Sequence, residues 1–492
     1  MRILSFLWRR ILGLAATLIL IIVVLAILAA LRISSSQQSD NMERVANKQE
    51  YLQGLSDLAT SNSQEAPRPN IIFILYDDLG YGDIGVGAQG LIKTPNINQL
   101  AANGVSLSDF HSPAPVCTPS RAGFLTGRLP ARAGLPNVVF PTGSTKSLIF
   151  DKLLSPKTNM RLPEEEITLA NILKASGYTT GMIGKWHMGD RSPSLPNDMG
   201  FDSYYGALYS NDMEPFAFYR NKEVEVEAPV DQTRMSELYA NEATAFIDAQ
   251  GEQPFFLYFA HNFPHDPLST RPERAGSSDA GLFGDVIEEI DDGIGQILRS
   301  LEKNGKLANT LIIISSDNGP WYLGNAGDQR GRKGNTFEGG MRVPFIAHWP
   351  AAITPGRVEP AMAMGTDLVP TILDILQLPP PADRILDGKS ILKVLTSSAS
   401  SPHDFIYYYD AEVLFAARNQ RFKYRGAAGV FYSTDQMPIG ASVPQKEWLF
   451  DLENDPRESY DTSLRHPGQL KALRKAFEDK RREMEENPRG WD

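Results

Sequence analysis

The sequence has only one cysteine, Cys117, among 492 residues, so no disulfide can form within the chain. Basic residues are also scarce: 48 Lys and Arg stand against 59 Asp and Glu, and the formal net charge of −11 argues against nucleic acid as a partner. Internal repeats and low-complexity segments are missing too, whereas 42% of the residues are hydrophobic, enough for a large buried core. An anionic ligand would therefore need a local cationic pocket within an acidic surface.

One long apolar run without charges occupies residues 11–31. It is long enough to cross a bilayer, and the three arginines within residues 1–10 favour the cytoplasmic side for that end. We therefore predict a transmembrane signal anchor over residues 11–31, with a cleaved signal peptide as the alternative because Ala29-Ala30 provides small residues near its end. The rest of the chain is expected outside the cytoplasm, in a bacterial periplasm or, after cleavage, as a secreted protein.

The next part of the chain changes character twice. Residues 32–69 are polar and predict a stalk or linker, with a segment from Met42 to Leu58 that could be helical. Residues 70–396 alternate apolar runs with amphipathic segments, which predicts an α/β fold with a large, mostly parallel sheet sandwiched by helices. Expected buried strands lie at residues 70–76, 178–183, 255–260 and 310–316, and expected helices at residues 94–104, 164–176 and 281–305.

A serine-rich stretch begins at residue 397 and separates the last part of the chain. Residues 397–492 predict a small α+β subdomain, with an antiparallel sheet and a terminal helix. The expected strands lie at residues 405–410, 413–425 and 447–451, and the helix at residues 467–487.

Polar side chains follow two of the expected central strands. Asp77 and Asp78 come directly after the first strand, and Asp317 and Asn318 come after the strand at 310–316. Open α/β sheets place their sites at the carboxyl ends of parallel strands, so we expect these four side chains to meet. Their hard oxygen donors suit Ca²⁺ or Mg²⁺ and offer nothing soft for zinc.

The single cysteine lies in the run Pro115-Val116-Cys117-Thr118-Pro119-Ser120-Arg121. Thr118 is predicted to cap a helix and Pro119 to occupy its first position, which places Cys117 where unpaired backbone N–H groups and the positive helix end collect. Such an end attracts anions, and Arg121 adds a planar fork of donors that matches a tetrahedral oxyanion. The alternative is a small structural thiol beside an ordinary helix start.

Two motifs carry a resemblance to a known family. Cys117-Thr118-Pro119-Ser120-Arg121, followed by Ala-Gly-Phe-Leu-Thr-Gly, resembles the signature of the type I sulfatases, in which the cysteine is oxidised to formylglycine. Gly177 to His187 resembles the second signature of the same family. The resemblance extends from Asn70 to about Pro456 and is closest to the arylsulfatase A type. It implies an alkaline-phosphatase-like fold, a hydrolase that cleaves sulfate monoesters to an alcohol and inorganic sulfate, and a maturation enzyme as partner.

The resemblance also implies roles for individual residues. The divalent cation, Ca²⁺ with Mg²⁺ as the alternative, would be held by residue 117 together with Asp77, Asp78, Asp317 and Asn318. The residues expected around the sulfate are Arg121, Lys185, His187, Ser210, His265 and Lys333. Among them, His187 would deprotonate the formylglycine hydrate, whereas His265, helped by Lys333, would protonate the leaving alcohol. Two of these motifs also have a structural interpretation: Ser210 could belong to a Ser-Asn-Asp turn, and Lys333 to a solvated Arg-Lys pair. Either His261 or His265 could transfer the proton, and either could be a structural histidine.

Two other functions compete with this one. A phosphonate or phosphate ester hydrolase of the same superfamily would share the metal and the fold, and an anchored binding protein would keep the pocket without converting Cys117. A cysteine-thiolate phosphatase is excluded because Arg121 lies too close to Cys117 for that phosphate loop. Substrate choice, between aryl, sugar and lipid sulfates, depends on loops such as 135–162 and 432–443, which carry no motif, and the oligomeric state is likewise open.

Overall fold

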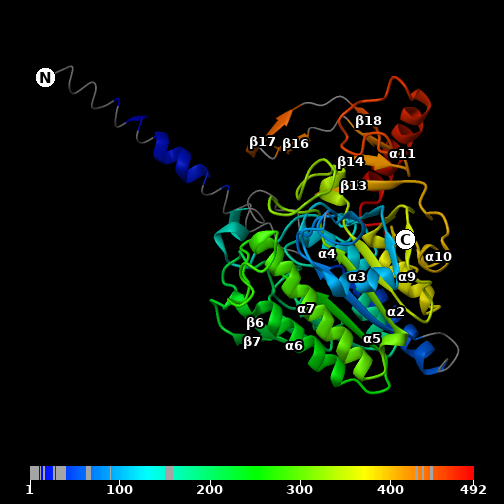
Figure 1. Ribbon diagram of the computed structural model, residues 1–492. Coiled ribbons are helices and arrows are strands. Elements are labelled where there is room, and N and C mark those ends of the chain that lie inside the picture. The colour runs from blue at the N-terminus through cyan, green and yellow to red at the C-terminus, as the bar shows by residue number, and fades with distance from the viewer. Residues whose placement is uncertain are drawn as a thin grey trace.

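The computed structural model describes residues 10, 13–14, 17–25, 28, 40–61, 68–88, 90–149, 159–426, 430–434, 437–443 and 447–492. Their largest feature is a mixed sheet with strand order β11-β2-β10-β9-β1-β8-β4-β5-β6-β7 (Figure 1). The five central strands β9, β1, β8, β4 and β5 are parallel, and β10 and β6 run antiparallel to their neighbours. The central strands are β1 (Asn70–Tyr76), β4 (Thr179–Gly184), β5 (Ser203–Gly206), β8 (Phe255–Ala260) and β9 (Thr310–Ser316).

The outer strands of this sheet are short. They are β2 (Val105–Leu107), β6 (Phe218–Arg220), β7 (Glu223–Val226), β10 (Phe345–His348) and β11 (Arg357–Glu359). Every residue of β1, β8 and β9 is buried, which confirms the prediction of strands covered on both faces.

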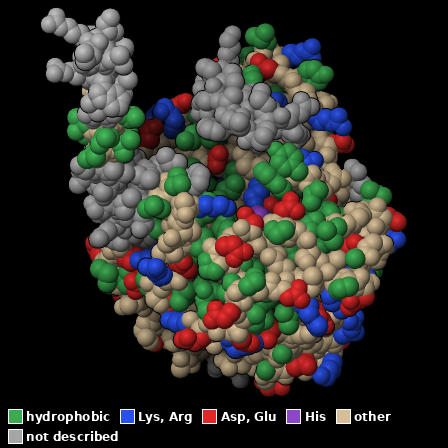
Figure 2. All heavy atoms as spheres, turned by 90° about the vertical axis from the view of Figure 1, so that its left-hand side faces the viewer, with side chains coloured by type: hydrophobic (Ala, Val, Ile, Leu, Met, Phe, Trp, Pro, Cys, Tyr) green, Lys and Arg blue, Asp and Glu red, His purple; other side chains and the backbone are tan. Residues whose placement is uncertain are grey.

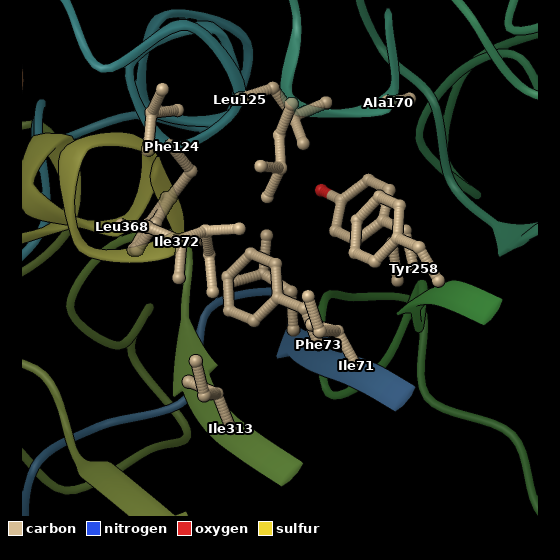
Figure 3. Packing of buried hydrophobic residues seen from close by; sticks show 14 of the residues in the cluster. Ile71, Phe73, Phe124, Leu125, Ala170, Tyr258, Ile313, Leu368 and Ile372 are labelled. Carbon is tan, nitrogen blue, oxygen red and sulfur yellow. The ribbon is translucent and has the colours of Figure 1, made fainter. Parts of the chain in front are cut away.

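Helices cover both faces of the sheet. One face packs against α4 (Cys117–Thr126), α5 (Leu169–Ala175) and α9 (Leu368–Ile375). Figure 3 shows this packing, with Phe124 and Leu125 of α4 lying over Phe73 of β1 and Tyr258 of β8. The rings of Phe73 and Phe124 lie 5.3 Å apart, and Gly127, with φ of 70°, ends α4. The helix that begins with the single cysteine is therefore fixed on the core of the sheet.

The opposite face packs against α3 (Pro95–Ala102), α6 (Met235–Asp248) and α7 (Gly281–Lys303). Helix α3 begins at Pro95, close to the expected start at residue 94, but the side chain of Thr94 makes no capping hydrogen bond. Asp291 of α7 is buried, and its carboxylate accepts hydrogen bonds from the backbone N–H groups of Asn96 (3.1 Å) and Ile97 (2.8 Å). Asp291 thus satisfies the first turn of α3 in place of a capping side chain from that helix.

The C-terminal subdomain is an antiparallel sheet covered by a helix, and it lies at one end of the large sheet (Figure 1). The single strand expected over 413–425 is two strands, because Asn419 Oδ1 accepts from the backbone N–H of Phe422 (2.7 Å) and closes a turn between them. Its elements are β13 (Ile406–Asp410), β14 (Val413–Arg418), β15 (Phe422–Arg425), β18 (Trp448–Asp451) and α11 (Pro467–Glu486). Smaller elements are β3 (Phe110–His111), α8 (Glu338–Met341), β12 (Ala363–Met364), α10 (Leu392–Ser397), β16 (Val430–Thr434) and β17 (Met437–Val443).

The helix expected over 164–176 is shorter than predicted. It begins at Leu169, where the Thr168 side chain accepts from the N–H of Asn171 and forms a capping box. Glu166 lies before this helix and is buried, with both carboxylate oxygens 3.0 Å from Arg128 Nη1. Glu166 therefore forms a buried ion pair with Arg128 outside the helix.

The expected stalk over 32–69 is also partly wrong, because α2 (Met42–Ser61) packs against α5. Val45 and Leu55 are buried in this contact, and Lys48 Nζ donates to the carbonyl oxygens of Glu164 (2.9 Å) and Glu166 (2.8 Å). The span expected over residues 11–31 lies partly outside the described residues. In the part of the chain that the structure describes, no helix combines the length and the apolar character needed to cross a membrane.

Candidate active site

The polar residues after β1 and β9 meet at the carboxyl edge of the sheet, as the sequence predicts. The two strands pair in parallel up to Tyr76 and Ser316, so the next residues lie side by side. The backbone N–H of Asp78 donates to Asp317 Oδ1 (3.2 Å), and Asn318 Nδ2 donates to Asp78 Oδ1 (2.7 Å). Asp78 has a φ of 68°, a strained value for a residue with a Cβ, and it turns its carboxylate into the group.

Cys117 lies beside these carboxylates. Its Sγ is 3.3 Å from Asp77 Oδ1 and 4.0 Å from Asp78 Oδ1, and the residue is 2% exposed. The helix begins at Cys117 itself and Val116 precedes it, so the prediction of Thr118 as the cap is wrong. Thr118 Oγ1 instead accepts from the backbone N–H of Val139 (3.3 Å). The side chain of Cys117 is thus in the first turn, at the positive helix end, as expected for an anion site.

Burial raises the pKa of the Cys117 thiol, and the negative charge of Asp77 raises it further. The thiol form is therefore favoured over the thiolate, although the thiolate is the form that acts as a nucleophile.

Two fully buried cationic side chains, Arg121 and Lys185, contact the carboxylates. Arg121 Nε donates to Asp317 Oδ2 (2.9 Å), and its Nη1 donates to the carbonyl oxygen of Lys185 (2.8 Å). Lys185 Nζ donates to Asp77 Oδ2 (2.5 Å) and lies 3.2 Å from Ser210 Oγ. These contacts bring Arg121, Lys185 and Ser210 into one group, as the motifs predicted.

Lys333 and His265 lie at the outer side of the group. Lys333 Nζ donates to Asp78 Oδ2 (2.9 Å), and His265 Nε2 lies 3.8 Å from the same oxygen. Their side chains keep 14% and 15% exposure, whereas those of Asp77 and Lys185 have none. In Figure 2 a histidine side chain is visible in a hollow between Lys or Arg and Asp or Glu side chains. These two residues are therefore the ones that can face a group outside the centre.

The two other histidines considered for the site, His187 and His261, differ in their surroundings. His187, with φ of 60°, has Nε2 at 3.1 Å from the carbonyl oxygen of Val139, while its buried Nδ1 finds no hydrogen-bond partner among the described residues. Burial and the nearby Lys185 hold the pKa of His187 well below its usual value, so the ring is neutral. His261 Nδ1 accepts from the N–H of Phe263 (2.9 Å), and burial lowers the pKa of His261 to about 3. His261 packs against aromatic rings, and its buried Nε2 has no hydrogen-bond partner in the described chain, whereas His265 is the histidine that approaches the carboxylate of Asp78.

The donor set fits a hard divalent cation. Ligand atoms of Asp77, Asp78, Cys117 and Asp317 all lie within 4.8 Å of one another. Burial would raise the pKa of Asp77, but Lys185 and other cations hold it well below its usual range; burial and the charge of Asp77 raise the pKa of Asp317 to about 7. Asn318 Oδ1 is buried without a hydrogen-bond partner in the described chain. Crowded carboxylates and an unsatisfied amide oxygen are what a calcium ion would relieve.

Sequence reasoning missed the backbone groups of the site. The carbonyl oxygen of Val139 orients His187, and the carbonyl oxygen of Pro320 accepts from the N–H of Lys333 (3.0 Å). Both contacts use a backbone carbonyl oxygen as the acceptor, which every residue type has. A pattern of residue types therefore could not predict them.

Comparison with known proteins agrees with this site. The family model described as Sulfatase matches residues 69–378, and a model described as N-sulphoglucosamine sulphohydrolase, C-terminal, matches residues 332–487. Arylsulfatase A from Bos taurus is 35% identical over 441 residues, which cover 80% of this chain and 83% of that protein. N-acetylgalactosamine-6-sulfatase from Mus musculus is 35% identical over 399 residues, covering 76% of this chain and 75% of the relative.

Solved structures show the same similarity. The PsFucS1 sulfatase from Pseudoalteromonas sp. superimposes with a TM-score of 0.76 at 28% identity, covering 91% of this chain and 96% of that one. Ps i-CgsB in complex with k-i-k-neocarrahexaose gives a TM-score of 0.71 at 29% identity, covering 84% and 92%. The sulfatase relatives favour a sulfate ester over a phosphate ester as the substrate. The chain belongs to the type I sulfatase family and is a sulfuric ester hydrolase with an alkaline-phosphatase-like fold.

Proposed function

We propose that this sulfatase works through formylglycine at position 117 and a divalent cation, Ca²⁺, with Mg²⁺ as the alternative. The observation that carries the proposal is the placement of Cys117, a buried thiol with a raised pKa, between three carboxylates and a guanidinium. A cysteine in that place is badly suited to act as a thiolate, whereas a hydrated aldehyde supplies one hydroxyl to attack sulfur and a second to release sulfate. Asp77, Asp78, Asp317 and Asn318 would hold the cation, which supplies charge neutralisation and orientation of the sulfate when bound.

The sulfate would be bound by the surrounding cations. Arg121, Lys185 and Lys333 each lie within hydrogen-bond distance of a different carboxylate of the centre, and Ser210 adjoins Lys185. Negative charge builds on the leaving oxygen as the S–O bond breaks, so positioned donors stabilise the transition state more than they stabilise the ester. These residues therefore orient the sulfate and favour its transfer.

Two histidines would move the protons. His265 lies at the open side, and burial and the positive charge of Lys333 lower its pKa, which makes the protonated ring a better acid toward the departing alcohol. His187 is neutral, and its Nδ1 is the atom that can accept the proton of the second hydroxyl when sulfate leaves. One histidine thus serves the alcohol and the other serves the release of sulfate.

The direct test is mass spectrometry of the tryptic peptide 94–121, from protein produced in a host that matures other sulfatases. We expect the sulfur of residue 117 to be replaced by an aldehyde oxygen, and sulfate to be released from esters by the same preparation. A thiol retained at position 117, in a host where a control sulfatase is converted, would overturn the formylglycine proposal. A faster release of phosphate than of sulfate from matched aryl esters would favour the phosphate ester rival.

We also propose that residues 11–31 hold the protein to a membrane with the catalytic part outside the cytoplasm, and that a maturation enzyme acts on Cys117. The supporting observations are the arginines among residues 1–10, the apolar run, and the exposed apolar side chains of residues 18–25, which are helical. The full chain should sediment with membranes, and a variant that lacks residues 1–31 should remain in the supernatant. Sedimentation of both forms would contradict the anchor.

A further inference from the structure

A second cluster of buried charges lies between the large sheet and the C-terminal subdomain. Its central residue is Glu338, the first residue of α8, which is 1% exposed. Glu338 Oε1 accepts from Tyr408 Oη (2.9 Å) and Lys423 Nζ (2.9 Å). Its Oε2 accepts from Arg418 Nη1 (2.7 Å) and lies 3.1 Å from His111 Nε2. Four side chains from other parts of the chain thus converge on one carboxylate.

The carboxylates of this cluster are paired with Arg418 and Lys423, and Lys423 Nζ also lies 3.0 Å from the buried Glu458. The cluster is not a metal site. Ligand atoms of Asp109, His111 and Glu338 lie within 4.8 Å of one another, but Arg418 Nη1 is within 3.1 Å of all three side chains. A guanidinium therefore already lies where a cation would bind. Burial would raise the pKa of Glu338, but Lys423 and Arg418 hold it well below its usual value, so the carboxylate is charged.

Glu338 belongs to the segment that carries Lys333, and the C-terminal subdomain holds this segment on one side. The N–H of Gly339 donates to the carbonyl oxygen of Arg330 (2.7 Å) and closes the segment into a turn. Arg425 of β15 donates to the carbonyl oxygen of Thr336 (2.9 Å). The ring of Phe337 is approached by the guanidinium groups of Arg330 (4.2 Å) and Arg425 (4.1 Å).

The other side of the segment contacts the active centre through its backbone. The N–H of Lys333 donates to Pro320 (3.0 Å), and the N–H of Gly334 donates to Pro115 (2.8 Å), both through carbonyl oxygens. Pro115 comes two residues before Cys117, and Pro320 comes two residues after Asn318. Residues 330–341 therefore form a bridge between the C-terminal subdomain and the two segments that bear the nucleophile position and the metal ligands.

We infer that Glu338 is a positioning residue for Lys333. Its bonds to Tyr408, Arg418 and Lys423 fix residues 330–341 on β13, β14 and β15, and this fixes Lys333 Nζ next to Asp78 and near His265. Glu338 itself does not reach the substrate. The inference rests on the proposed role of Lys333 in helping the leaving alcohol to depart, and it gives the C-terminal subdomain a part in turnover.

The test compares Glu338→Gln with Asp109→Asn in matured protein. Both variants remove one buried charge beside Arg418, but only Glu338 is part of the segment that bears Lys333. Rates are measured on a series of aryl sulfates, from p-nitrophenyl sulfate, whose phenolate leaves without help, to unsubstituted phenyl sulfate, which needs protonation. Glu338→Gln should lose about 10- to 100-fold in kcat on phenyl sulfate and less than about 3-fold on the p-nitrophenyl ester.

Asp109→Asn should lower the stability of the fold while leaving the dependence on the leaving group unchanged. An equal loss on all esters in Glu338→Gln, or no loss on any of them, would overturn the positioning role. Failure of the matured wild-type protein to hydrolyse any sulfate ester would instead contradict the proposed function. The two failures are therefore distinguishable.

A second readout does not need activity. Hydrogen exchange of residues 330–341, measured in the chain with Cys117 unconverted, should become faster in Glu338→Gln and stay unchanged in Asp109→Asn. If Glu338→Gln does not fold, the double variant Glu338→Gln with Lys423→Met removes one charge of each sign and should show the same steepened dependence on the leaving group. Unchanged exchange in the variant that folds would also overturn the inference.

Discussion

The molecule contains two buried clusters of charged side chains, and they differ in how completely their polar atoms are satisfied. In the cluster around Glu338, both carboxylate oxygens of Glu338 and all three nitrogen atoms of Arg418 have hydrogen-bond partners, and Glu458 Oε1, which has none, lies 3.0 Å from the ammonium group of Lys423. In the cluster around Asp78, the Nδ1 of His187 and the Oδ1 of Asn318 have none among the residues described. Buried polar groups are normally paired, so the incomplete cluster is the one built for ligands and the complete one is built for structure.

The largest effect should come from replacing the nucleophile position. Cys117→Ser places an ordinary hydroxyl beside Asp77, and this hydroxyl can take sulfate from the ester but has no second hydroxyl to expel it. Turnover should fall by about 10⁴-fold, with one sulfate bound covalently per chain, detected by intact-protein mass spectrometry. Cys117→Ala should lose turnover without any adduct. Sustained turnover by the serine variant would sink the proposed role of residue 117.

Removal of the cation should affect only the incomplete cluster. Dialysis against a calcium chelator should lower kcat by about 10³-fold, and addition of Ca²⁺ should restore it. At about 100 times its Kd, the ion should also stabilise the fold by about 2.7 kcal/mol, seen as a rise in Tm. Asp109→Asn should keep this rise, whereas Asp78→Asn should lose it. An equal rise in Asp78→Asn would place the ion elsewhere.

His261 and His265 follow β8 in the same segment, so replacing each of them compares a packed histidine with one that faces the open side of the site. His265→Asn should lower kcat on phenyl sulfate by about 10²-fold, because His265 faces the open side of the site. His261→Asn should cost less than about 3-fold, since its ring packs against Tyr239 at 5.3 Å between centroids and against Phe263 at 5.5 Å. Steady-state kinetics of both variants distinguish the roles, and a reversed order would assign the acid to His261.

The cluster around Glu338 should make the free energy of unfolding depend on pH. The pKa of Glu338 is held well below its usual 4.5, so the unfolded chain binds more protons at this group than the folded chain does as pH falls below 4.5. Its stabilisation is therefore present above pH 4.5 and is lost on further acidification. At pH 7, Glu338→Gln should lower the free energy of unfolding by about 3 kcal/mol. Urea titrations should show that this difference between variant and wild type becomes smaller below pH 4.5. A difference that grows on acidification would contradict the charged state of Glu338.

Much of the fold and of the site could be predicted because the signals are local. Strands β1, β8 and β9 are short apolar runs buried on both faces, and the carboxyl edge of a parallel sheet brings Asp78 and Asn318 together whatever the loops do. The roles of the remaining site residues came from the family motifs and not from spacing. Helix ends were less predictable, since the start of α4 differs from the expected cap by the local backbone geometry of Val116 and Cys117.

Contacts between distant parts of the chain could not be predicted. Glu338 lies five residues from Lys333, but its partners Arg418 and Lys423 come 80 and 85 residues later. The docking of α2 depends on Lys48, a residue that ordinarily marks a solvated face and that here points at two carbonyl groups. Burial of Lys48 lowers its pKa to about 8. The amino-acid composition of the segment does not show that this lysine is buried.

The exposure of the site side chains falls from 15% at His265 to nothing at Asp77 and Arg121. In the proposed mechanism, a sulfate at the carboxylates would be shielded from water by these buried side chains, while the alcohol part of the ester would lie on the side of His265, toward the solvent. The buried side chains would therefore contact only the sulfate group, and the alcohol part of the ester would contact the residues at the rim of the site. One alcohol can thus be exchanged for another by changing the loops at that rim, while the parts of the chain that break the S–O bond stay as they are.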